Sequence, residues 1–228
     1  MWQEVRSELR PRGLEIVTVA LDTGGAEAAG PWIDLAKPEH PALVDEAHLV
    51  DELLGVVNVP SGVWIDEEGV IVRPPEPAFP GRVVLAELDL PDDLPPRLAE
   101  MLAESQKIQV EPERYLNALR DWAARGAESK FALPPDEVIE RSRPRPPDES
   151  RAAASFEIAQ HLHRNGHPAD AVRWFREAHR LQPDNWTYKR QAWSFVDVLQ
   201  GPTDEYEGDW LSDVRAIGAK NYYPRVEL

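Results

Sequence analysis

The chain has 228 residues, no cysteine and a formal net charge of −16 at pH 7, with 42% hydrophobic and 29% charged residues. This length and composition are typical of a globular protein with one large domain or two small ones. The acidic balance argues against a nucleic-acid or anionic-membrane partner, because phosphate groups would be repelled, and no apolar run reaches the roughly 18–20 residues of a membrane span. Residues 1–13 are polar and amphipathic rather than a signal peptide, so we expect a cytoplasmic location.

The first quarter of the chain predicts alternating helices and strands. Residues 1–10 carry apolar side chains at three- and four-residue spacing, which indicates a helix. Residues 14–21 are nearly all apolar or β-branched, as in a strand that is buried on both faces of a parallel sheet. A helix is expected over 26–36, where Gly30-Pro31 could restart it, then a short strand over 41–45. A further helix is expected over 47–54, closed by Gly55.

Residues 62–65 and 70–72 predict a β-hairpin that directly follows Val59-Pro60. Its turn is Asp66-Glu67-Glu68-Gly69, where glycine can take a positive φ. Pro60 stands before the first strand, where a missing N–H group costs least. This arrangement resembles the cis-proline hairpin of the thioredoxin-like fold, in its redoxin (TlpA/ResA-like) branch. That hairpin has an apolar-x-x-Pro step, a strand, an Asp-x-x-Gly turn and a second strand. The order of elements over 1–72 resembles the second half of a redoxin domain.

That resemblance implies a cis Val59–Pro60 peptide bond, with the Val59 backbone beside an extended substrate peptide. It also implies thiol–disulfide exchange, which needs a thiolate that this chain does not have. The expected function is therefore non-catalytic protein binding or scaffolding. The alternative is an N-terminally truncated form of an active thiol–disulfide oxidoreductase (peroxiredoxin/TlpA-like). In the family, a first strand and a Cys-x-x-Cys pair come just before the segment that residues 1–4 resemble. Under this alternative, Met1 would be an internal methionine of a longer protein.

The middle of the chain is rich in proline. Four prolines at 74, 75, 77 and 80 predict a stiff loop, and helical spacing of apolar residues predicts helices over 94–105, 113–125 and 134–141. Residues 142–148 have the composition of a polyproline-like linker. The expected organisation is a thioredoxin-like α/β domain that lacks its N-terminal part over 1–132, a proline-rich linker over 133–150 and an all-α domain over 151–228.

Residues 151–184 resemble one tetratricopeptide repeat. The matching positions are Ile158-Ala159, Leu162, Gly166, Ala171, Phe175, Ala178 and Pro183. They predict an antiparallel helix pair with Ala159, Ala171 and Phe175 at the seam. A single repeat cannot bury its own faces, so it either presents a face to a partner or caps the first domain. On that face the candidate partner-binding residues are Trp174 and Trp186, surrounded by Arg164, Arg173, Arg176 and Arg180.

Two further patterns suggest other chemistry. Asp22-Thr23-Gly24 resembles the active-site triplet of retropepsin-like aspartic proteases, although it also fits a turn at the end of a strand. Neither a glycine-rich flap nor a second strand ending in Gly-Arg or Gly-Asn accompanies it. Glu157 and His161 have a spacing that can hold a metal, whereas solvent-exposed histidines explain the pattern without one. We therefore predict no catalytic residue, no metal site and no cofactor, and a protein or peptide partner that would contact Val59, Pro60, Trp174 and Trp186.

Overall fold

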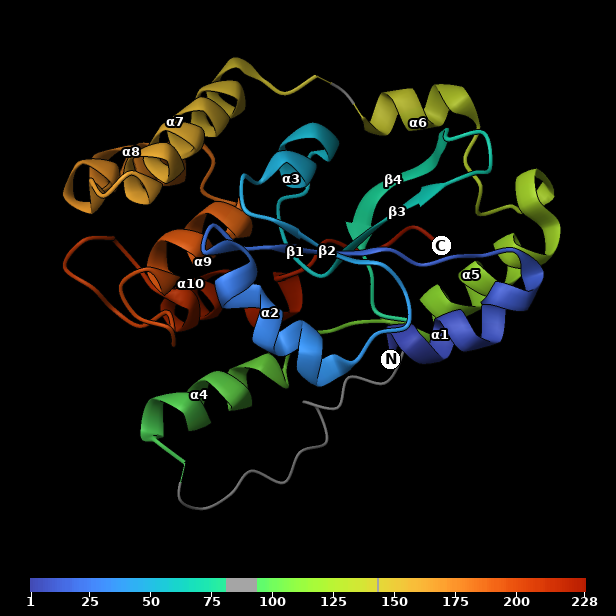
Figure 1. Ribbon diagram of the computed structural model, residues 1–228, viewed down its shortest axis with the longest axis horizontal. Coiled ribbons are helices and arrows are strands. Elements are labelled where there is room, and N and C mark those ends of the chain that lie inside the picture. The colour runs from blue at the N-terminus through green and yellow to red at the C-terminus, as the bar shows by residue number, and fades with distance from the viewer. Residues whose placement is uncertain (81–93, 143) are drawn as a thin grey trace.

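The computed structural model describes residues 1–80, 94–142 and 144–228, so residues 81–93 of the expected first domain and Arg143 of the expected linker lie outside the description. The protein is a mixed α/β structure that is about 54% helical and has small sheets. The described strands lie between residues 18 and 77, and helices surround them (Figure 1). Among the described helices, none is both long and apolar enough to cross a bilayer.

The first sheet has two parallel strands, β1 (Thr18–Leu21) and β2 (Ala42–Asp45). Helix α1 (Trp2–Leu9) precedes it, and α2 (Gly25–Ala36) joins the strands as one continuous helix with Pro31 inside it. Helix α3 (Leu49–Leu54) follows and ends at Gly55, as expected. The expected strand over 14–21 is only half present, and all four residues of β1 are half-buried rather than buried on both faces. Full burial on both faces is typical of strands inside wider parallel sheets, whereas β1 pairs with β2 alone among the described strands.

The second sheet is the expected hairpin of β3 (Ser61–Ile65) and β4 (Ile71–Pro77), which are antiparallel. Gly69 has a φ of 81° in its turn, and the Val59–Pro60 peptide bond is cis, as predicted. Strand β4 continues through prolines at 74, 75 and 77 that we expected in a loop. An edge strand tolerates them, because the missing N–H groups can face away from the partner strand. In the part of the chain that is described, no hydrogen-bonded ladder joins the two sheets.

Helix α5 (Pro112–Arg125) covers the hairpin and forms a cluster with α1. The Trp64 indole N–H donates to the Tyr115 hydroxyl at 3.0 Å, and the Trp64 ring stacks on Trp122 with centroids 4.9 Å apart. A Cβ at Gly62 would lie 2.6 Å from the Tyr115 hydroxyl oxygen, so this contact requires glycine. We call the apolar group around Trp64 the hairpin cluster; it includes Leu9 from α1.

The C-terminal half is helical. Helix α6 (Pro135–Arg141) is followed by α7 (Pro147–Arg164) and α8 (Pro168–Leu181), which form the expected helix pair around a turn where Gly166 has a φ of 80°. At their seam Ala159, Ala171 and Phe175 are no more than 1% exposed, as predicted. Helices α9 (Trp186–Ser194) and α10 (Trp210–Ile217) pack with this pair. We call the apolar group that these helices bury, which includes Phe156, Phe175 and Trp193, the helical cluster.

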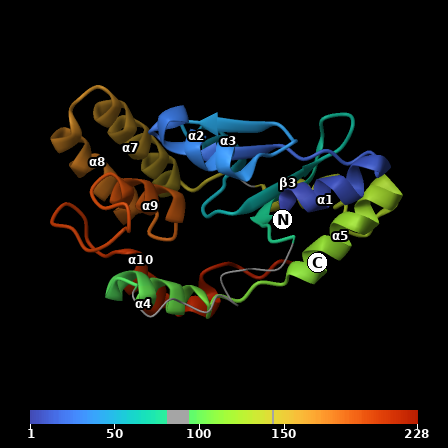
Figure 2. The same ribbon diagram turned by 60° about the horizontal axis from the view of Figure 1, so that its bottom comes forward.

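Helix α4 (Pro96–Ser105) lies against α10, at the bottom of Figure 2. Arg97 binds the carboxylate of Asp209 at 2.5 Å, and Arg215 of α10 reaches Glu104 of α4 at 3.3 Å. Met101 also packs on the helical cluster. Although α4 precedes α5 in the sequence, it therefore packs with the C-terminal helices.

A buried ion pair fastens α3 to the helical cluster. His48 donates from Nδ1 to Asp51 Oδ2 at 2.9 Å and from Nε2 to Gln191 Oε1 at 3.1 Å. The same Gln191 oxygen accepts the backbone N–H of Thr23 at 3.0 Å. Because both partners of the His48 ring are acceptors, both ring nitrogens carry a proton and the ring is an imidazolium. The side chains of His48 and Asp51 are 3% and 1% exposed, so the ion pair is shielded from water.

The C-terminal tail, residues 222–228, runs from the helical cluster back to the hairpin. Tyr222 packs in the helical cluster, and Leu228 packs on the hairpin cluster. Between them the Glu227 carbonyl accepts a hydrogen bond from the guanidinium of Arg73 at 2.6 Å. The tail thus contacts both clusters.

Arg73, which is 1% exposed, is the residue of β4 that holds the tail. Besides Glu227, its guanidinium binds the carboxylate of Glu76 at 2.5 Å and the Phe131 carbonyl at 2.9 Å. It also lies 5.6 Å from the centroid of the Trp64 ring. One buried cation therefore connects the hairpin, the segment after α5 and the C-terminal tail.

Candidate functional site

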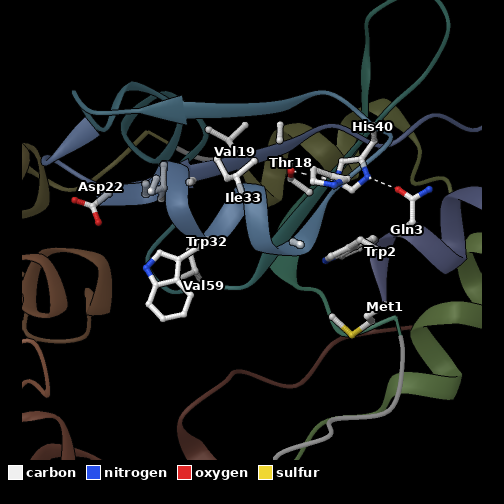
Figure 3. A pocket seen from close by; sticks show the side chains of 16 residues that line it. Met1, Trp2, Gln3, Thr18, Val19, Asp22, Trp32, Ile33, His40 and Val59 are labelled. Carbon is white, nitrogen blue, oxygen red and sulfur yellow. Dashed lines mark hydrogen bonds between the residues drawn. The ribbon is translucent and has the colours of Figure 1, made fainter. Parts of the chain in front are cut away.

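A groove of about 570 Å³ runs along β1 (Figure 3). Its walls come from β1, from α2, from the start of α1 and from the segment that enters β3. Asp22 lies at one end, and Met1, Trp2 and Gln3 lie at the other. Most of the lining side chains are apolar, among them Val19, Leu21, Ala29, Trp32, Ile33 and Val59.

The edge of β1 that faces away from β2 has no strand beside it among the described residues. The N–H groups of Thr18 and Asp22 bond to the carbonyls of Pro41 and Asp45 on the β2 side, at 3.0 and 3.3 Å. In a parallel pair, alternate residues of a strand face the same neighbour. The backbone N–H and C=O groups of Val19 and Leu21 therefore point away from β2, and we call them the outer edge of β1.

A polar chain closes one end of the groove. His40, 8% exposed, lies between Gln3 and Thr18, with Nδ1 3.3 Å from Gln3 Oε1 and Nε2 3.2 Å from Thr18 Oγ1 (Figure 3). Burial, helped by the charge of Arg6, lowers the pKa of His40, so the ring is neutral at pH 7. Nδ1 then donates to Gln3, and Nε2 accepts the Thr18 hydroxyl.

That order of hydroxyl, imidazole and acceptor is the order found in nucleophilic catalysis. Here the third member, Gln3, is a neutral amide and carries no charge to stabilise an imidazolium. Its Oε1 also accepts the backbone N–H of Glu39 at 2.9 Å, which ties the start of α1 to the segment before β2. The contacts of His40 and Gln3 therefore join the start of α1, β1 and the segment before β2, and fix this wall of the groove.

The other end of the groove is formed by Asp22-Thr23-Gly24. Asp22 Oδ1 accepts the N–H of Gly24 at 2.8 Å, the hydrogen bond of a turn at the end of a strand. Thr23 is 5% exposed, and its hydroxyl donates to Gln160 Oε1 of α7 at 3.0 Å. The triplet therefore forms the turn at the end of a strand that its sequence also fits. The hydroxyl of its threonine is hydrogen-bonded to α7.

Val59 lines the groove with its side chain, but its backbone groups already have partners. Its N–H bonds to Asn58 Oδ1 at 2.9 Å, and its carbonyl accepts the hydroxyl of Tyr223 at 2.7 Å. The carbonyl of Val57, two residues earlier, accepts the N–H of Trp186 at the start of α9 at 2.7 Å. The segment that resembles a substrate-binding loop is therefore the place where the helical part and the C-terminal tail dock, and a peptide could pair with Val59 only by displacing Tyr223.

The two tryptophans expected on the helical face have different environments. Trp186, which we expected to contact a partner, is 6% exposed and packs edge-on against Tyr222, with centroids 4.6 Å apart. Trp174 is half-buried, and the Arg173 guanidinium lies 5.2 Å from its ring centroid. Among the arginines expected around these tryptophans, Arg176 donates to the Asp204 carbonyl at 3.0 Å, which is a contact within the chain.

The histidines of the helix pair have different surroundings. His161 and His167 are exposed, whereas His163 stacks on Phe195 with centroids 3.7 Å apart. Burial lowers the pKa of His179 to about 4, and its Nε2 donates to the Tyr188 carbonyl at 3.3 Å. In the described part of the chain, no three histidine, aspartate or glutamate side chains are grouped so that they could hold a metal.

No protein-family model, no curated protein and no solved structure matches this chain. The groove and its residues are therefore the features of this chain that bear on its function.

Proposed function

We propose that this protein binds an extended segment of a partner polypeptide, which adds as a strand to the outer edge of β1, and that it acts as a binding or scaffold protein without catalysis. The observation that carries the proposal is the outer edge itself, where backbone groups of Val19 and Leu21 face an apolar groove. An added strand gives affinity through main-chain hydrogen bonds and specificity through side-chain pockets. The cis-proline hairpin beside the groove supports descent from redoxin-like proteins.

Proline at position 19 tests this binding mode. Val19→Pro removes an N–H group that does not pair with β2, and an edge strand tolerates such a proline. Val19→Ala is the matched control, because it shortens the same side chain and keeps the N–H group. We expect a peptide selected from a phage-displayed library of linear peptides, measured by fluorescence anisotropy, to bind the proline variant about tenfold more weakly than the alanine variant.

Hydrogen exchange gives an independent readout of the same step. Binding of the selected peptide is expected to slow exchange at the N–H groups of Val19 and Leu21 in the unmodified chain. Unfolding curves of both variants establish that they remain folded. Equal affinities for the folded proline and alanine variants would refute strand addition at β1, and a dimer that Val19→Pro dissociates would identify a second copy as the occupant instead.

A second candidate is an active thiol–disulfide oxidoreductase in a longer form of this protein. The side chains of Met1 and Trp2 line the groove, so a strand preceding Met1 would reach it directly. In the redoxin-like proteins that the hairpin resembles, such a strand leads to the Cys-x-x-Cys pair. The intact mass of the protein from its native source decides this, since a mass of 25.7 kDa would leave no room for the segment.

The 228-residue chain itself is expected to show no dithiol-dependent disulfide reductase activity. The reaction needs a thiolate to attack the disulfide sulfur, and the chain has no cysteine. Reduction of a fluorescent disulfide substrate by dithiothreitol should proceed at the same rate with and without the protein. Any acceleration that depends on protein concentration would contradict the non-catalytic assignment.

A further inference from the structure

We infer that the groove selects an extended segment with an arginine at the end of β1 where Asp22 lies, with its guanidinium between the Asp22 carboxylate and the Trp32 ring. This inference depends on the proposed strand addition and adds the chemical class of the bound segment. It combines three observations: an unpaired carboxylate, an uncovered aromatic ring and the charge of the surrounding surface.

The carboxylate of Asp22 is held in place and forms no ion pair with a cation of the described residues. Its Oδ1 accepts the Gly24 N–H at 2.8 Å, which orients the group at the end of the groove (Figure 3). No ion pair among residues 1–80, 94–142 and 144–228 includes Asp22. A fixed carboxylate at the end of a strand edge can therefore receive a basic side chain of an added strand.

The ring of Trp32 lines the same groove and is 73% exposed. It extends from α2 beside the groove, near Val59 (Figure 3). Within the described ranges it makes no aromatic pair and has no cation over its face. Both faces of an exposed ring are accessible, and tryptophan is the side chain that best binds a cation through its ring face.

The charge of the surface favours a basic partner segment over a second copy of this chain. Two copies would each carry a net charge of −16. Glu27 and Asp34, both exposed on α2, take part in no ion pair in the part of the chain that is described. The negative potential that they add near the groove attracts a basic segment and repels an acidic one.

Arginine fits this end of the groove better than lysine. Its planar guanidinium can stack on an indole ring while two N–H groups remain directed at a carboxylate. A lysine ammonium forms the ion pair but cannot stack in the same way. A lysine segment should therefore bind more weakly than an arginine segment of the same sequence.

Synthetic peptides test the inference directly. The first probe is Arg-Val-Thr-Val-Thr-Val, acetylated at its N-terminus and carrying fluorescein on a diamine linker at its C-terminus. The second is Val-Thr-Val-Thr-Val-Arg-amide with fluorescein at its N-terminus, because the added strand can run in either direction. Matched probes carry citrulline, which keeps the shape and removes the charge. We expect one arginine peptide to bind about tenfold more tightly than its citrulline form.

Variants of the protein assign that preference to its residues. Asp22→Asn keeps the acceptor for the Gly24 N–H and removes the charge, whereas Glu128→Gln removes one charge at an exposed site outside the groove. The preference for arginine over citrulline should vanish in Asp22→Asn, persist in Glu128→Gln and decrease severalfold in Trp32→Ala.

The outcomes separate this inference from the proposed function. If arginine and citrulline peptides bind equally and Val19→Pro weakens both, strand addition stands and selection of arginine is wrong. If the preference is the same in Asp22→Asn and Glu128→Gln, the attraction comes from the overall charge and the assigned site is wrong. If none of the peptides binds, both the inference and the proposed strand addition are overturned.

Discussion

Replacing Asp51 with alanine is expected to lower the free energy of unfolding by about 3–5 kcal/mol, because it leaves the buried His48 imidazolium without its carboxylate. The matched control is Asp51→Asn, whose amide can donate to Nδ1 of a neutral imidazole while Nε2 still donates to Gln191. Asparagine should therefore cost only about 1–2 kcal/mol. Urea denaturation followed by circular dichroism measures both, and a loss below about 1 kcal/mol in Asp51→Ala would refute the buried ion pair.

The same ion pair makes stability depend on pH with a defined sign. Burial lowers the pKa of His48, but the hydrogen bond and charge of Asp51, with Gln191 and Asp45, outweigh it and raise the pKa. A raised pKa in the folded state means that the contribution is fully present below the unfolded pKa of about 6.5. It is lost as the pH rises through the folded pKa.

A titration of stability isolates this effect. We expect the difference in unfolding free energy between the unmodified chain and Asp51→Asn to be largest near about pH 6 and to shrink towards about pH 9. Comparison of the two proteins cancels the contributions of the other histidines, such as His179. A difference that stays constant over this range would show that His48 does not bind its proton more tightly in the folded state.

Replacing Arg73 with alanine is expected to cost a similar amount, about 3–5 kcal/mol. The substitution leaves the Glu76 carboxylate and two carbonyls, of Phe131 and Glu227, without their donor inside the protein. Burial already raises the pKa of Glu76, partly offset by Arg73, so the isolated carboxyl would protonate more readily still. The loss should be measurable as a lower urea midpoint with a similar slope.

A double variant distinguishes loss of charge balance from loss of packing. Arg73→Met combined with Glu76→Gln removes both charges and retains most of the side-chain volume. It should be more stable than Arg73→Met alone, because no uncompensated charge then remains buried. If the double variant is the less stable of the two, the contacts of Arg73 with the carbonyls and with Trp64 outweigh its pairing with Glu76.

Local patterns in the sequence predicted local structure well. The hairpin follows from β-branched residues on either side of Asp66-Glu67-Glu68-Gly69, and its turn has the positive φ that glycine allows. The helix pair follows from small residues at 159 and 171 with Phe175 between the helices. In each case the residues that define the element are close in sequence, so propensity and packing point to the same structure.

The expected buried strand over 14–21 shows why other features were missed. Leu14 and Ile16 are apolar because they pack in the hairpin cluster, not because they belong to a central strand. Periodicity alone cannot tell which core an apolar residue enters. Periodicity likewise does not show that Trp186 packs in the helical cluster. Its place at the start of α9 is indicated by Asn185, a residue type that often precedes a helix. The Asn185 side chain accepts the Tyr188 N–H at 3.2 Å.

The groove could not be predicted from any single stretch. Its lining residues come from the start of α1, from β1, from α2, from the segment around His40 and from Val59, and only the folded chain brings them together. The ion pair of His48 is similar, since its second partner, Gln191, is 143 residues away. Asp22 was singled out by its Asp-Thr-Gly motif, but for protease chemistry rather than for the end of a binding groove.

The path of the C-terminal tail has a consequence for synthesis on the ribosome. Arg73 reaches its partner Glu227 across 154 positions of sequence, and the hairpin cluster includes the last residue, Leu228. When the N-terminal half emerges, Arg73 therefore lacks one of its acceptors until Glu227 has been synthesised. Contacts of such long sequence separation slow folding and prolong the time during which the outer edge of β1 is open to other chains.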